Sequence, residues 1–268
     1  MTQNMNQPKM NADETTLVAY AFDNHVARIS INRPAKANAI STAVYEQLLA
    51  AFLKADLDPE VRVVVLEAAG ERHFCAGMDL QEQSGAPAYP HPMKGERRNL
   101  HEALMEIGKP TIAAINGIAV GGGCELALAC DLRVAASHAL FGQPEAKVGM
   151  GANFASVLLP LVLPRAIAFE MLYTGRMVTA EEALHFGLIN RVVPGGQLRA
   201  EVDALATQIA ANAPLSVRKI KETALRGWGL PPSTALRLNV GPNSYASEDR
   251  IEGARAFLEK RTPRFTGK

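Results

Sequence analysis

The sequence predicts an α/β fold: a largely parallel sheet covered by helices, followed by a helical C-terminal segment. Up to Glu145, apolar and β-branched runs alternate with segments of helical periodicity, which favours parallel strands connected by helices. Beyond Glu145 the apolar residues recur mainly at helical spacing. The 268 residues, of which 48% are hydrophobic and 21% charged, suffice for a large core and exclude wholesale disorder.

In the first part of the chain, strands are expected at residues 16–22, 26–31, 61–66, 111–115 and 132–135. Helices are expected at residues 41–57, with Ser41 as N-cap, at 99–107 and at 124–130. The long apolar stretch 111–130 also contains Asn116, the glycine triplet 121–123 and Glu125, which a membrane span would not tolerate. It is therefore predicted to form a buried strand, a turn and a buried helix.

The remaining segments are predicted from turn and capping signals. Residues 81–98 are rich in Pro, Gly and charge and indicate a long surface loop. A helix at 157–163 is expected to be interrupted by Pro160, and a capping box at 179–182 opens a short helix that Gly187 ends. Amphipathic helices are expected at 198–212, 216–226 and 247–261. The predicted organisation is a flexible leader (1–15), an α/β core (16–195) and a helical C-terminal segment (196–268).

Charge and cysteine content restrict the possible partners and compartment. The net charge of +1 provides no general attraction to nucleic acid or to an anionic membrane. Three cysteines are too few for a disulfide framework and match no zinc-binding spacing, so we expect a reducing compartment, the cytoplasm. The polar N-terminus has no apolar signal core.

Two short segments could present backbone N–H groups to a ligand. Residues 75–80 follow a predicted strand, and the glycines at 121–123 stand between a strand and a helix, at the positive end of the helix dipole. Converging N–H groups from two such segments could hold a developing oxyanion. A tight structural turn is the alternative interpretation. The dinucleotide fingerprint G-x-G-x-x-G and the nucleotide P-loop are both absent.

Two glutamates are candidates for proton transfer. Glu125 stands in an apolar predicted helix directly after the glycines, and Glu145 follows the next strand. Burial raises a carboxyl pKa towards the range useful for acid–base catalysis. A capping or ion-paired carboxylate is the alternative for each glutamate alone, but both beside the glycine turn favour a catalytic function. His73, His101 and His185 have no partner spacing and are interpreted as surface or capping residues.

Four ordered motifs make the sequence resemble the crotonase family, the enoyl-CoA hydratase/isomerase superfamily. They are NRPAKANA at 32–39, FCAGMDL at 74–80, NGIAVGGGCELA at 116–127 and FGQPE at 141–145. The resemblance covers roughly residues 16–265. It implies a crotonase-type spiral of repeated β-β-α units, with a helical C-terminal trimerisation segment that builds homotrimers or hexamers.

The resemblance also implies an acyl-CoA thioester substrate and roles for individual residues. By position, the oxyanion hole matches the N–H groups of Met78 and Gly122, and the catalytic pair matches Glu125 and Glu145. Substrate-binding positions match Lys36, Ala37, Ala76, Asp79, Leu80, Gln81 and Gly121. No metal or cofactor is implied, since coenzyme A is part of the substrate.

The implied reaction is hydration of a 2-enoyl-CoA. An isomerase or another lyase of the superfamily, or a non-catalytic acyl-CoA-binding homologue, remains the alternative. Residues 149–156 differ from the Pro-Gly-x-Gly-Gly-type turn of many hydratases, because side chains occupy positions where the family often has bare backbone.

Overall fold

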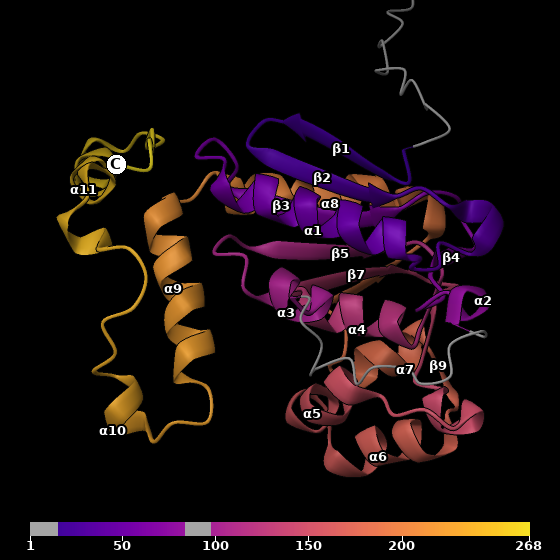
Figure 1. Ribbon diagram of the computed structural model, residues 1–268. Coiled ribbons are helices and arrows are strands. Elements are labelled where there is room, and N and C mark those ends of the chain that lie inside the picture. Colours follow the sequence, from indigo (N-terminus) through magenta and orange to yellow (C-terminus); the bar gives the residue numbers. More distant parts are fainter. Residues whose placement is uncertain (1–15, 84–97) are drawn as a thin grey trace, which may run out of the picture.

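The computed structural model describes residues 16–83 and 98–268, and its largest element is a six-stranded sheet (Figure 1). In spatial order the strands are β1 (Val18–Asp23), β2 (Val26–Ile31), β3 (Val63–Ala68), β5 (Thr111–Ile115), β7 (Leu132–Ala136) and β10 (Arg191–Val193). Only the β1–β2 pair in this sheet is antiparallel. The structure therefore confirms the predicted, largely parallel sheet.

A second sheet of short strands creates the spiral. It contains β4 (His73–Cys75), β6 (Ile118–Val120), β8 (Leu140–Gly142) and β9 (Met177–Thr179), in that order. In the pairs β3/β4, β5/β6 and β7/β8, the first strand joins the large sheet and the second joins the small one. The chain thus repeats a β-β unit and steps from layer to layer, as the predicted fold class requires.

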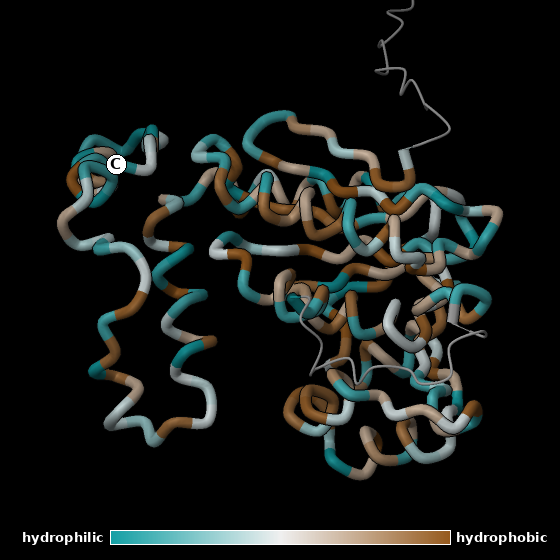
Figure 2. Tube along the Cα trace, in the orientation of Figure 1, coloured by the Kyte–Doolittle hydropathy of each residue, from teal (hydrophilic) through white to brown (hydrophobic). Residues whose placement is uncertain are grey.

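Helices cover both faces of the large sheet. On β3, Val64 and Leu66 pack into the cluster that includes α1 (Thr42–Leu57) and α4 (Gly122–Ala129), whereas Val63 and Val65 pack against α8 (Leu198–Ala210). Successive side chains of a strand point to opposite faces, so this strand is apolar throughout because both faces are covered. Figure 2 shows the hydrophobic segments gathered in this sheet-bearing part.

Two local predictions need correction. Strand β6 was not expected between the predicted strand and helix of 111–130. Pro160 does not interrupt its helix: α5 (Asn153–Val162) runs through it and ends before Pro164, where α6 (Arg165–Thr174) begins. The hydrogen bond that Pro160 cannot donate would go to the carbonyl of Ser156, which lies on the exposed side of the helix, where water can replace the proline N–H.

Several capping predictions are confirmed. The Ser41 hydroxyl accepts from the Val44 N–H at the start of α1, and Thr179 and Glu182 form the capping box of α7 (Ala180–His185). Asn99, which was expected inside the helix 99–107, instead caps α3 (Leu100–Met105). Of the predicted loop 81–98, residues 84–97 lie outside the described residues, and α2 (Leu80–Gln83) occupies its start.

The C-terminal helices α9 (Pro214–Gly227), α10 (Pro232–Ala235) and α11 (Glu248–Glu259) lie beside the sheets (Figure 1). The buried Lys221 Nζ joins α9 to the sheet region, since it donates to the Lys109 carbonyl at 2.9 Å and to Asp131 Oδ2 at 2.8 Å. Arg62 donates to the Phe265 carbonyl at 2.7 Å and so holds the C-terminal tail.

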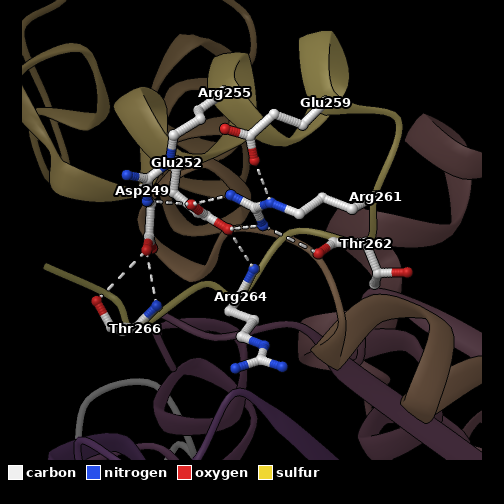
Figure 3. A network of polar contacts seen from close by, with 8 residues as sticks. All are labelled: Asp249, Glu252, Arg255, Glu259, Arg261, Thr262, Arg264 and Thr266. Carbon is white, nitrogen blue, oxygen red and sulfur yellow. Dashed lines mark hydrogen bonds and ion pairs between the residues drawn. The ribbon is translucent and has the colours of Figure 1, made fainter.

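The tail after α11 folds back on that helix through a network of charges (Figure 3). Glu252 accepts from the Arg261 guanidinium at 2.6 and 2.9 Å, from Arg255 at 2.7 Å and from the Arg264 N–H at 2.9 Å. These donors hold the pKa of Glu252 well below its usual range. Asp249 accepts from the backbone of the last residues in the same way. Within the described residues, no helix has the length and apolar character to cross a bilayer.

Candidate functional site

Two loops meet where the small sheet ends, and two glycines permit the approach. Gly77 has a φ of +84°, and a Cβ there would lie 3.0 Å from both the Gly122 nitrogen and the Val120 oxygen. A Cβ on Gly123 would lie 2.1 Å from the Cys75 carbonyl oxygen. Only glycine allows backbones to come this close. The loop after β4 and the turn before α4 are therefore in direct backbone contact.

This contact brings together the two predicted oxyanion donors. A Cβ placed on Gly122 would lie 3.7 Å from the Met78 nitrogen, so the two residues are neighbours. Gly122 is the first residue of α4, where an N–H has no acceptor within the helix and the dipole is positive. The peptides around Met78 are fixed because Ile40 donates to the Gly77 carbonyl at 2.8 Å and accepts from the Asp79 N–H at 3.0 Å.

Glu125 lies one helical turn beyond this pair. Its N–H donates to the Gly121 carbonyl at 2.9 Å, and its side chain is only 10% exposed. The carboxylate is oriented because Oε1 accepts from the Ala155 N–H of α5 at 2.9 Å. The altered stretch 149–156 thus supplies a backbone donor to Glu125, a contact that the sequence did not predict.

Glu145 reaches the same turn from the other side. It begins a 3₁₀ helix (Glu145–Val148), and its Oε1 would lie 3.2 Å from a Cβ on Gly121. In the amide orientation that satisfies its hydrogen bonds, the buried Gln143 donates to both carboxylate oxygens at 2.9 and 3.0 Å. Burial, with the negative charge of Glu125 as a smaller cause, raises the pKa of Glu145 to about 7.

His101 was wrongly predicted to be a surface or capping residue. It is buried on α3, and its Nε2 lies 3.0 Å from the Gly122 oxygen and 3.7 Å from Glu125 Oε2. Its ring stacks on Phe154 of α5 at 5.2 Å between centroids. The available sequence signal was helical spacing: His101 shares the buried face of α3 with Leu104, three residues on. His185, by contrast, is exposed at the end of α7, as predicted.

The predicted substrate-binding residues surround the loop after β4. Ala76 donates its N–H to the Ala37 carbonyl at 3.1 Å, and Lys36 Nζ lies 3.3 Å from Gln81 Oε1. Leu80 is 50% exposed, and Gly121 is in the turn before α4. The buried Asp79 accepts from Arg33 at 2.6 Å and from the Gln81 N–H at 3.1 Å, so its carboxylate ties this loop to the motif at 32–39.

The cysteines near the site are not nucleophile candidates. All three are fully buried, which raises their thiol pKa values to about 12. These are Cys75, Cys124 and Cys130. Across residues 16–83 and 98–268, no three His, Cys, Asp or Glu side chains are grouped where they could hold a metal ion.

Known proteins are similar to this chain in both sequence and fold. Residues 21–268 match the enoyl-CoA hydratase/isomerase family model. The chain is 38% identical to (E)-benzylidenesuccinyl-CoA hydratase of Thauera aromatica, with 93% of this chain and 99% of that protein covered. It is 42% identical to carnitinyl-CoA dehydratase of Proteus mirabilis, with 91% and 95% covered.

A solved enoyl-CoA hydratase from Bacillus anthracis superposes with a TM-score of 0.86 at 36% identity, with 94% of this chain and 100% of that chain covered. The enoyl-CoA hydratase of Mycobacterium tuberculosis gives a TM-score of 0.85 at 37% identity, with 94% and 99% covered. The chain belongs to the enoyl-CoA hydratase/isomerase family, the crotonase superfamily.

Proposed function

We propose that the chain is a 2-enoyl-CoA hydratase that adds water across the double bond conjugated to the thioester. One observation carries this proposal: backbone amides from two separate loops, at Met78 and Gly122, meet beside the buried carboxyl group of Glu125 and the partly buried one of Glu145. Two such N–H donors would polarise the thioester carbonyl and stabilise the enolate that forms when a nucleophile attacks C3.

The environments of the two glutamates support different roles. Glu145, whose pKa is raised to about 7, retains its proton in a large fraction of molecules at neutral pH and can donate it to C2. Glu125, whose Oε1 accepts from the Ala155 N–H, is the base that takes a proton from the water as its oxygen bonds to C3. The proton lost by Glu145 balances the one gained by Glu125, and exchange with solvent restores both. Neither a metal nor a redox cofactor is needed.

The alternatives make different demands on the site. Isomerisation moves one proton within the substrate and requires no bound water, whereas two carboxyl groups beside one turn can hold water between them. The relatives named above are a hydratase and a dehydratase, which run the same chemistry in opposite directions. A non-catalytic acyl-CoA-binding protein would not need a carboxyl group in the energetically unfavourable environment of Glu145.

The test is an assay with a panel of 2-enoyl-CoA thioesters. An apolar cavity of about 350 Å³ is lined by Ala146, the residue after Glu145, and by the α6 residues Phe169 and Tyr173. The panel therefore includes the bulky cinnamoyl-CoA alongside crotonyl-CoA. Hydration removes the conjugated absorbance and adds the mass of one water. Isomerisation leaves the mass unchanged, and a binding protein retains the substrate intact. Glu125→Gln and Glu145→Gln should each lower kcat by about 10²–10⁴, and retention of hydration by Glu145→Gln would refute its role.

A homotrimeric or hexameric assembly is part of this proposal. The C-terminal helices and their connections expose several large apolar side chains, a pattern typical of a surface that a second copy covers. These are Ile220, Trp228, Leu236, Tyr245, Phe257 and Leu258. The mass of the particle in solution tests the assembly. The free thiols support a reducing location such as the cytoplasm.

A further inference from the structure

We propose that His101 is a positioning residue that holds the Gly122 amide and the Glu125 carboxylate in fixed relation to each other. This proposal rests on the oxyanion and base roles proposed above. The supporting observation is that one imidazole nitrogen faces both groups: Nε2 lies 3.0 Å from the Gly122 oxygen and 3.7 Å from Glu125 Oε2.

The contact with Gly122 determines which atom carries the hydrogen. A carbonyl oxygen only accepts, so His101 Nε2 must be protonated and donate to it. The same N–H then points its positive end into the region where Glu125 carries negative charge. At 3.7 Å the glutamate contact is electrostatic, because a hydrogen bond requires a shorter distance. His101 therefore binds the backbone of one catalytic group and attracts the other.

Gly122 needs such a constraint because it lies in a run of glycines. The peptide before it is fixed, since Gly121 donates to the Gly142 carbonyl at 3.0 Å and its own carbonyl accepts from the Glu125 N–H at 2.9 Å. The peptide after it carries the carbonyl that His101 binds. With His101 in place, both peptide planes around Gly122 are held. The direction of its N–H is then fixed before substrate binds, as preorganised electrostatic stabilisation requires.

The orientation of the imidazole is in turn set by packing. Phe154 stacks on the ring at 5.2 Å and an interplanar angle of 30°, and its neighbour Ala155 donates to the other oxygen of Glu125. Both residues belong to the stretch that replaces the glycine-rich turn of many hydratases. In this chain that stretch therefore positions His101 and Glu125 together.

Two substitutions separate the hydrogen bond from the packing. His101→Phe keeps an aromatic ring on Phe154 but removes the donor, whereas His101→Gln places an amide N–H near the position of Nε2. We expect His101→Phe to lower kcat by about 10- to 100-fold with KM within about threefold of the wild type. We expect His101→Gln to recover most of this loss. Thermal unfolding of both variants checks that the fold is retained.

A spectroscopic measurement tests the positioning without turnover. In the infrared difference spectrum of bound butyryl-CoA labelled with ¹³C at the carbonyl, the thioester stretch should fall on binding to the wild type. It should return towards the free value in His101→Phe and fall again in His101→Gln. Wild-type kcat and frequency in His101→Phe would overturn the proposal, and so would a His101→Gln variant as impaired as His101→Phe.

The outcomes for the two proposals differ. If the wild type hydrates no enoyl-CoA, or binds butyryl-CoA with an unshifted carbonyl, the proposed function fails. If hydration and the carbonyl shift are present in the wild type but do not depend on the residue at 101, only the role of His101 fails.

Discussion

Replacing Glu145 by glutamine should stabilise the folded protein at alkaline pH while lowering kcat for the proposed hydration by about 10²–10⁴. The native carboxyl titrates near 7 and the unfolded one near 4.5. Between these values the unfolded chain releases its proton and the native chain keeps it, so the free energy of unfolding falls as the pH rises. Above pH 7 the destabilisation is complete, and below pH 4.5 it is absent. Glutamine carries no charge at any pH and avoids it.

The magnitude follows from the size of the pKa shift. A change from 4.5 to about 7 corresponds to a ceiling of about 3–4 kcal/mol at roughly 1.4 kcal/mol per pKa unit. Glu145 is only partly buried, and the Gln143 amide donates to it, so solvent and this donor reduce the effect. We therefore expect Glu145→Gln to be more stable than the wild type by about 1–2 kcal/mol at pH 8.5 and by about zero at pH 4.5.

Paired unfolding experiments across this pH range test the prediction. In thermal scans the difference corresponds to a Tm increase of about 2–6 °C at pH 8.5. The scans are run at one protein concentration, because the proposed assembly would also affect Tm. Glu181→Gln, on the exposed first turn of α7, controls for the loss of one negative charge. A stability difference that does not change between pH 4.5 and 8.5 would refute the assignment of an unfavourable carboxylate at Glu145.

Three further predictions concern the backbone contact at Gly123, the attachment of α9 and the buried thiols. Gly123→Ala should lower the free energy of unfolding by about 3 kcal/mol or more, because its Cβ would meet the Cys75 backbone. Gly196→Ala is the control: a Cβ there has no atom within 4 Å and should change the free energy of unfolding by less than about 0.5 kcal/mol. Denaturant titration compares the two variants, and equal effects would contradict the close approach. Lys221→Met should lower the free energy of unfolding by about 2–4 kcal/mol, because Asp131 loses its buried partner. Limited proteolysis should then cut before α9 faster than in the wild type, and wild-type resistance would show that Lys221 does not hold this helix. The three cysteines should fail to react with a disulfide reagent such as DTNB until the protein is denatured, since burial keeps their thiols protonated; rapid reaction of any thiol in the native protein would contradict this.

Strands and helices were predicted accurately where a few neighbouring residues marked both of their ends. The strands at 26–31 and 111–115 were predicted at their observed bounds, because their apolar runs end at clear turn signals. Strand β6 has only three residues and lies within a longer apolar stretch, so periodicity could not separate it from its neighbours. Pro160 indicated a break, but the exposed position of the unpaired carbonyl removes the energetic reason for one.

The site residues also differ in whether neighbouring residues or contacts between separate elements reveal them. Glu125 was recognisable because a charged residue inside an apolar helix is unfavourable without a function or a partner. His101 was not, because its importance comes from the contact of α3 with α4 and α5. Its hydrogen-bond partner Gly122 is 21 positions away, and Ala155, which orients Glu125, is 30 positions from that residue.

Read alone, the chain specified its layered α/β architecture, several of its helix caps and the residue types of the proposed acyl-CoA site, since propensity, periodicity and capping act over a few neighbouring residues. Folding in three dimensions was needed to bring the Met78 and Gly122 amides together, to raise the pKa of Glu145 and to place His101 between Gly122, the proposed oxyanion donor, and Glu125, the proposed base. Distances, desolvation and hydrogen-bond direction are properties of groups from separate elements, and they arise only when packing has excluded water and brought those elements into contact.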